Sequence, residues 1–453
     1  MSIDMASIRQ CLDGAVPAAI ATCSADGVPN VSYISEVHYI DARHVALSYQ
    51  FFNKTRANVI ANGCAQALVI DPGLGAQYRL ELKYLRTETS GALFETMRVK
   101  LAGIAAHTGM ASVFRLLGSD VYEVLGVSQV GGAGERVSGT PVELLPQVRR
   151  ISERLVGCGG LEALLDALFD GLETDLLIRQ AMVFLHDDRG NRLFLIGSCG
   201  YPRSGVGSEI PLGSGIVGIA AAERTPIRIT HMAEEFRYSD AIRKHVAETG
   251  NAADLETAIP LPGLKAPGSQ LAVPVVAAGR LLGVLCVESE RDGAFGYDSE
   301  DMLVTIANQF ASSLFLLDER RGTESPADRA PRLRTRATPM RIRCVNENSS
   351  IFIDDDYLIK GVAGAIFWKL VRDYSESGRT EFSNRELRTD PAIRLPEFSE
   401  NLEARLVLLK RRLQEKCRDI AIVPVARGRF RLDVSRPLRL ESIQDKNPAR
   451  RPA

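Results

Sequence analysis

Short apolar runs alternate with polar turn segments over the first part of the chain. Such runs occupy residues 18–22, 31–34, 44–48 and 65–70, and Asp26-Gly27 marks the turn between the first two. Apolar and β-branched runs bounded by Gly and Asp predict strands, and a Gly at the turn tolerates the positive φ that tight hairpins need. This part of the chain therefore reads as antiparallel sheet, with one helical stretch at 57–62.

The middle of the chain changes to a helical spacing of apolar residues and then returns to strands. Residues 144–172 carry Val148, Ile151 and Leu155, then Leu161, Leu164, Leu165 and Leu168, with a break at 157–160. This spacing predicts two helices. Strands are expected at 182–185 and 193–197, two more within 271–289, and a long helix at 299–317.

The last part combines both patterns after a segment without apolar periodicity. Residues 321–340 are rich in Pro, Arg and small polar residues, which is typical of a linker. Strands are expected at 341–344 and 351–353, helices at 361–374 and 398–417, and a hairpin at 420–434. Ser383 and Glu386 have the spacing of a capping box, so another helix is expected to begin there.

Composition changes this picture little. The chain has 453 residues, which predicts about three domains at roughly 150 residues each. Its 55 Lys and Arg residues balance 56 Asp and Glu residues, so nucleic-acid binding would need a local basic patch. No apolar run reaches the roughly 20 residues that span a bilayer, and the first ten residues lack the pattern of a signal peptide, so we expect a cytoplasmic protein without membrane contact.

The cysteines do not form a metal-binding pattern. The chain has 8 of them, and none belongs to a CxxC pair. A zinc or iron–sulfur site needs several ligands that converge on one metal. We therefore predict no metal site, and buried, reduced cysteines.

Residues 1–135 resemble the pyridoxamine 5'-phosphate oxidase-like FMN-binding split barrel. The resemblance rests on a strand that ends in Ser48-Tyr49-Gln50, a polar Asn-Lys-Thr segment and a following helix, and segments 85–89, 97–107 and 118–124 look like the later half of such a barrel. The resemblance implies that Lys54 and Thr55 face the phosphate of FMN. It also implies that Ser48, Tyr49 and Gln50 lie near the ring or the ribityl chain. Haem, a deazaflavin or no ligand remain alternatives, and no catalytic residue is assigned.

Residues 145–320 resemble a GAF domain. The features that carry the resemblance are the Gly213-Ser214-Gly215 segment, the paired strands of 271–289 and the long helix that follows. It implies a small-molecule pocket between the helix that starts at 213–218, the loop of 231–245 and the sheet around 273–275. The ligand stays unnamed. The helices near 145–156 and 299–319 are expected to pack together and to form a homodimer, although they could also simply cover their own sheet.

Residues 341–436 resemble the winged helix of response regulators. Carried over, the groove-facing helix would present Arg405, Arg411 and Arg412, and the wing would present Arg427, Arg429 and Arg431. Guanidinium groups suit guanine edges and phosphates. Val407, Leu408, Glu400 and Glu403 depart from a DNA-facing pattern and would suit a protein partner better.

The predicted fold class is multidomain α+β: a split β-barrel, a GAF α/β sandwich and a winged helix-turn-helix. This order favours a cytoplasmic one-component transcriptional regulator that senses a flavin-linked or other small-molecule cue and binds DNA. Two alternatives remain open. One is an FMN-dependent oxidoreductase with a regulatory GAF domain, and the other is a protein-interaction scaffold.

Overall fold

The structure is a computed structural model. It describes residues 3–12, 18–34, 36–49, 53–72, 74–107, 116–132, 144–187, 190–230, 259–319, 339–345, 348–391, 393, 402–426 and 428–443. Predicted site residues Gln50 and Arg427, and the loop of 231–245, lie outside these ranges. Among the described helices, none is both long enough and apolar enough to cross a membrane.

The N-terminal region is a seven-stranded antiparallel sheet with the order β2-β1-β5-β6-β7-β4-β3. Its strands are β1 (Ala18–Cys23), β2 (Pro29–Ile34), β3 (Val37–Asp41), β4 (His44–Tyr49), β5 (Cys64–Ile70), β6 (Gln77–Glu88) and β7 (Gly118–Gly131). The 3-10 helix η1 (Met5–Leu12) packs against β3 and β5, and the helix α1 (Asn53–Asn62) packs against β1 and β2. The predicted first hairpin is confirmed, with Gly27 at φ 82° in its turn.

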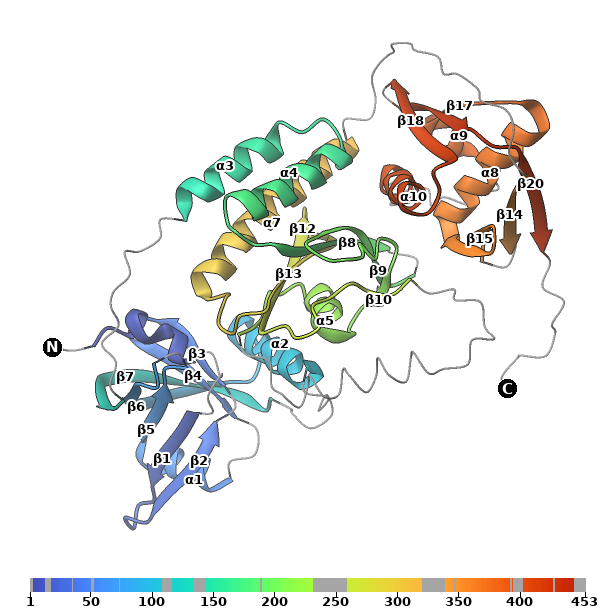
Figure 1. The fold of residues 1–453 in the computed structure, drawn as a ribbon. Coiled ribbons are helices and arrows are strands. Elements are labelled where there is room, and N and C mark those ends of the chain that lie inside the picture. The colour runs from blue at the N-terminus through green and yellow to red at the C-terminus, as the bar shows by residue number, and fades with distance from the viewer. Residues whose placement is uncertain are drawn as a thin grey trace, which may run out of the picture.

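Helix α2 (Ala92–His107) lies between this sheet and the middle of the chain (Figure 1). Its Val99 is buried in the same cluster as Ile219 and Ala220 of the middle region, and Arg98 pairs with Glu223 at 2.7 Å. Segment 97–107, expected in the later half of a barrel, is thus part of a helix that also packs on the neighbouring region.

The middle region is a six-stranded sheet with the order β10-β9-β8-β13-β12-β11. Its strands are β8 (Gln180–Asp187), β9 (Arg192–Cys199), β10 (Glu209–Pro211), β11 (Ile227–Ile229), β12 (Ser269–Ala277) and β13 (Arg280–Ser289). Successive residues of a strand point to opposite faces. Phe194 and Ile196 accordingly join one core with the covering helices, whereas Leu193 and Leu195 join another with α5 (Gly215–Glu223).

Three helices cover the first face of this sheet: α3 (Leu145–Val156), α4 (Leu161–Thr174) and α7 (Tyr297–Glu319). The predicted packing of α3 against the long helix is confirmed, and both helices contribute to the core that includes Ile151 and Phe310. The pairing of two chains through these helices stays a prediction.

The C-terminal region places three helices between two small sheets. Its elements are β14 (Met340–Val345), β15 (Ser350–Ile353), β16 (Asp356–Ile359), α8 (Gly361–Ser377), β17 (Glu381–Ser383), α9 (Asn384–Thr389), α10 (Leu402–Lys416), β18 (Ile420–Ala426), β19 (Arg429–Val434) and β20 (Leu438–Ile443). The sheets have the orders β16-β15-β14-β20 and β17-β19-β18. Strand β20 was not predicted from the sequence, and it pairs in parallel with β14.

Helix α10 is the main contact between the C-terminal region and the middle region. In Figure 1 it lies on the side of the C-terminal region that faces α4 and β9, and it packs against both. On its other side it packs against α8, β16 and β18. One continuous apolar core therefore runs through both regions.

Candidate functional site

The hydroxyl of Thr55 lies at the centre of a small polar cluster near the start of α1. Asn30 Nδ2 donates a hydrogen bond to it at 2.8 Å, and the Ser32 hydroxyl lies 2.9 Å away. Thr55 is 4% exposed, whereas Lys54 beside it points into solvent. Asn30 and Ser32 were missed from the sequence, although their place on the strand that pairs with β1 could have indicated them.

Arg56 lies beside this cluster, and its guanidinium group is already paired. Its Nη1 donates to Asp120 at 2.8 Å and its Nη2 to the Thr87 hydroxyl at 3.2 Å, while the guanidinium carbon lies 4.1 Å from the centre of the Tyr49 ring. This places predicted residue Tyr49 against the arginine. Ser48 is buried, and its hydroxyl accepts a hydrogen bond from the Glu36 N–H at 3.2 Å.

The cavity between these groups is about 10 Å³. It is lined by Ile20, Ile34, Leu47, Ser48, Tyr49, Thr55, Arg56, Val59, Asp120 and Tyr122. Such a space holds about one water molecule. The hydroxyl and amide groups would suit a phosphate, but the isoalloxazine ring of FMN does not fit this cavity.

A buried carboxylate, Glu288 of β13, lies on the α5 face of the middle sheet, where the sequence predicted a ligand pocket. Glu288 is 5% exposed, and it accepts hydrogen bonds from Tyr201 Oη at 3.0 Å, from the Leu264 N–H at 3.0 Å and from Gln270. Burial and the neighbouring carboxylate raise the pKa of Tyr201 far above its ordinary value. Tyr201, Leu264 and Gln270 thus hold the Glu288 carboxylate in place.

The cysteines are free and differ in exposure. Burial is confirmed for Cys11, Cys286, Cys344 and Cys417, whereas Cys64 is exposed. Burial also raises the pKa of Cys199 to about 11.

The predicted groove-facing arginines of α10 point into protein rather than solvent. Arg405 is 9% exposed, lies 3.2 Å from Asp187 and stacks at 4.2 Å over the Phe194 ring. Arg411 donates to the Ile196 carbonyl and to Asp166, each at 3.2 Å. All of these partners belong to the middle region.

Arg412 is buried within its own region. It is 4% exposed, and its Nε donates to the Leu358 carbonyl at 3.0 Å while Nη1 lies 3.2 Å from Glu415. Burial lowers its pKa, and the neighbouring Glu415 opposes that shift. In this arrangement the side chain offers no surface to a nucleic acid.

The hairpin and α9 carry three exposed arginines. Arg429 is exposed, whereas Arg431 pairs with Asp433 at 2.6 Å. Arg385 and Arg388 of α9 are also exposed, and sequence reasoning missed both. No ion-pair partner for Arg385, Arg388 or Arg429 is found within the described residues.

These three arginines line a cleft of about 590 Å³ between the C-terminal and middle regions. The wall on the other side includes Gly159, Glu162 and Leu317. Because α10 residues Leu406 and Val407 also line the cleft, it borders the contact between the two regions.

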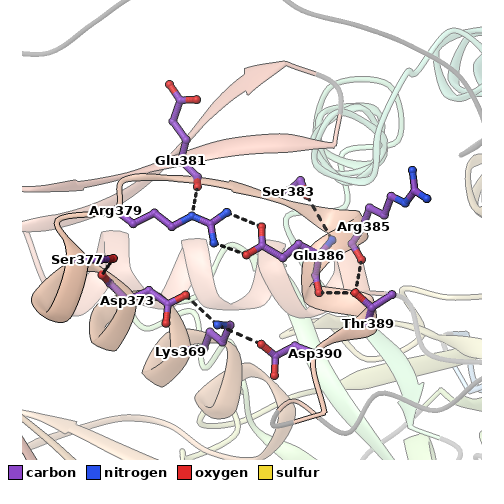
Figure 2. A network of polar contacts seen from close by, with 10 residues as sticks. All are labelled: Lys369, Asp373, Ser377, Arg379, Glu381, Ser383, Arg385, Glu386, Thr389 and Asp390. Atoms are coloured by element: carbon purple, nitrogen blue, oxygen red, sulfur yellow. Dashed lines mark hydrogen bonds and ion pairs between the residues drawn. The ribbon is translucent and has the colours of Figure 1, made fainter.

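A local network fixes the position of α9 (Figure 2). The Ser383 hydroxyl accepts a hydrogen bond from the Glu386 N–H at 3.3 Å, as the predicted capping spacing requires. Arg379 binds the Glu386 carboxylate, with Nη2 2.6 Å from Oε2. Lys369 bridges Asp373 and Asp390 at 2.8 and 3.1 Å, while Arg385 points away from the network.

Residues 159–314 match the family model described as GAF domain. The middle of this chain is a GAF domain. The match lies within the predicted segment of 145–320, and a GAF domain implies a small-molecule ligand. A comparison with curated proteins gives no match to this chain.

Several solved structures are similar to parts of the chain. The GAF domain of an Acinetobacter phosphoenolpyruvate-protein phosphotransferase is 24% identical with TM-score 0.30, over 39% of this chain and 95% of that one. Free methionine-R-sulfoxide reductase from Neisseria meningitidis is 21% identical with TM-score 0.29, over 38% and 88%. An FMN-binding protein from Syntrophomonas wolfei is a distant match, 16% identical with TM-score 0.24, over 28% and 90%.

Proposed function

We propose that the chain is a one-component transcriptional regulator. In this proposal the GAF domain binds a small molecule, and residues 341–436 form a winged helix that binds DNA. The order of elements supports the second part, because three helices are followed by the β18–β19 hairpin and the hairpin pairs with β17, which lies between the first two helices. Winged members of the helix-turn-helix class combine such helices with a terminal hairpin.

One observation carries the proposal: three arginines, for which the described part of the chain offers no ion-pair partner, converge from α9 and the hairpin on one cleft. Exposed guanidinium groups without carboxylate partners are available to phosphates, whereas paired ones must first break an ion pair. Arg385, Arg388 and Arg429 therefore make the backbone contacts in this proposal, and Arg411 joins them only when α10 is free.

For the N-terminal sheet we propose an anion site at Lys54 and Thr55, supported by the neighbouring Asn30 and Ser32. A phosphate would receive one cation and several hydroxyl or amide donors there. Because the adjoining cavity does not admit a flavin ring, no flavin chemistry is proposed.

The DNA-binding proposal is tested with Arg385→Ala, Arg388→Ala and Arg429→Ala combined in the full chain. The measurement is fluorescence anisotropy with a pool of genomic duplexes, titrated upward from roughly 50 mM salt. Losing three phosphate contacts should weaken binding by about tenfold or more and lower the salt slope by up to about 2.7.

A matched control removes the same charge elsewhere, with Arg203→Ala, Arg418→Ala and Arg439→Ala. These residues are exposed and do not line the cleft. An equal effect of both triple variants, or an unchanged salt slope, would reject the assignment. A protein partner recovered without any DNA binding would favour the scaffold alternative.

A further inference from the structure

Helix α10 is buried around most of its circumference. The buried residues are Leu402, Ala404, Arg405, Leu406, Val407, Leu408, Leu409, Arg412 and Leu413. A helix on the surface of a domain usually buries one stripe and exposes the opposite face. Here the inner stripe packs on α8 and β16, and the outer face packs on α4 and β9 of the GAF domain.

The outer face of α10 and the GAF domain are complementary in charge. Lys410 Nζ lies 2.8 and 2.7 Å from the two carboxylate oxygens of Glu162. Arg411 reaches Asp166, and Arg405 reaches Asp187, each at 3.2 Å. Three cations of the helix thus meet three carboxylates of the neighbouring domain.

One carboxylate of α10 completes the contact in the opposite direction. Glu403 Oε1 accepts a hydrogen bond from the Leu161 N–H at 3.2 Å, at the first residue of α4. The residue before it, Gly160, has no side chain to cap the helix, so the cap comes from α10. A carboxylate at a helix N-terminus is favoured both by the free N–H groups and by the helix dipole.

We infer that the acidic face of the GAF domain, formed by Glu162, Asp166 and Asp187, holds α10 in an arrangement closed to DNA. This inference rests on the proposed function. The carboxylates occupy the cations that phosphates would otherwise bind, and the α4 side covers the helix face that would enter a groove. Release of α10 is then the regulated step.

Strand β9 links this contact to the α5 face of the sheet, where the sequence predicts the ligand pocket of the GAF domain. The Ile196 carbonyl and the Phe194 ring touch α10, whereas Leu193 and Leu195 of the same strand pack with α5. A ligand that binds the α5 side more tightly in the released arrangement shifts the equilibrium by that difference in affinity. The two sites are thus separated by the thickness of one sheet.

The test reverses the charge at two positions of the acidic face, with Glu162→Lys and Asp166→Lys in the full chain. Their side chains are 41% and 62% exposed, so the GAF core does not depend on them. Amide exchange over α10 should rise by about tenfold or more, and the apparent Kd for genomic duplexes should fall by about tenfold, because a larger fraction of the protein is competent to bind.

The control variant, Glu290→Lys with Asp301→Lys, adds the same positive charge to exposed GAF positions. It separates release from the attraction of DNA to charge added outside the cleft, and both of its readouts should stay within about twofold of the unmodified chain. A second variant, Glu162→Lys with Lys410→Glu, restores the ion pair with reversed signs. It should return the exchange of α10 toward that of the unmodified chain.

The outcomes separate the two proposals. Faster exchange of α10 with tighter DNA binding, absent from the control, supports both. If exchange and DNA binding of the charge-reversed variant match the unmodified chain, the closed arrangement is rejected. If α10 exchanges faster and still binds no DNA, the proposed function is rejected and the docking of α10 on the GAF domain stands.

Discussion

Helices α9 and α10 belong to the same small region, yet their charged residues are used in opposite ways. The polar contacts of α9 stay within the region, where Arg379 binds Glu386, and both arginines of the helix, Arg385 and Arg388, are exposed. In α10, Arg405, Lys410 and Arg411 pair with carboxylates of the GAF domain, and Arg412 is buried within its own region. An exposed arginine on α9 is available to a partner, whereas an arginine on α10 must first be released.

This difference shows that residue type alone does not define a binding face. Arg388 and Arg412 lie on helices of the same region. Arg388 is exposed, whereas Arg412 is buried, with 4% of its surface exposed. Hydrogen bonds stabilise a buried guanidinium group, and removing the group leaves its carbonyl acceptor, here that of Leu358, without a donor. The two helices should therefore respond very differently to the same substitution.

The largest expected contrast is between Arg412→Ala and Arg388→Ala. Arg412→Ala should destabilise the C-terminal region by about 2–4 kcal/mol, because the Leu358 carbonyl loses its buried donor and a cavity forms. Arg388→Ala should stay within about 0.5 kcal/mol. Trp368 is the only tryptophan of the chain and lies in α8, so its fluorescence in urea reports this region.

Arg412→Met separates the packing from the hydrogen bond. Methionine fills much of the same volume without charge, so the Arg412→Met variant should be destabilised less than the Arg412→Ala variant. If alanine and methionine at position 412 both leave the urea midpoint unchanged, the buried donor is unimportant and the comparison of the two helices fails.

A smaller effect is expected at the start of α9. Ser383→Ala removes the hydroxyl that accepts the Glu386 N–H, and it should cost about 1 kcal/mol. Ser383→Gly should cost only a few tenths, since glycine is tolerated at this position. The same fluorescence titration measures both, with Ser377→Ala at the end of α8 as the control. Equal losses at 383 and 377 would speak against the cap.

The local parts of this region could be predicted from the sequence. The spacing of Ser383 and Glu386 predicted the cap. The helix expected at 398–417 contains α10, in which the stripe formed by Leu402, Leu406, Leu409 and Leu413 at helical spacing is buried. Both signals depend on residues a few positions apart. The departure at Val407 and Leu408 was also visible, and both residues are buried where α10 meets its neighbours.

The partners of the charged residues could not be predicted in this way. Lys410 meets a carboxylate 248 positions away, and Arg411 one 245 positions away. Nothing in the local pattern of α10 identifies Glu162 or Asp166. Likewise Thr55 was predicted near a phosphate site, but its pairing with Asn30 and the closure of the cavity depend on how β2 folds back.

The smallest expected effect is the pH dependence of the contact between Asp187 and Arg405. Burial opposes ionisation of Asp187, but the Arg405 charge, the Gly190 N–H and the Arg192 charge outweigh it, so its pKa lies below the ordinary 3.8. A carboxyl group with a lowered pKa in the folded state stabilises that state at neutral pH and loses this contribution as the pH falls through its folded pKa. The contact should therefore be constant between about pH 5 and pH 8 and weaken only below about pH 4.

Asp187→Asn isolates this contribution from those of Glu162 and Asp166. Asparagine keeps the size of the side chain but carries no charge. Exchange over α10, corrected for the intrinsic pH dependence of the reaction, should be faster by a few-fold at pH 7 and should show a smaller further rise between about pH 5 and pH 3.5. A rise already present between pH 6 and pH 7 in the unmodified chain would contradict a carboxylate held ionised by Arg405, since the contact would then depend on a group that titrates near neutrality.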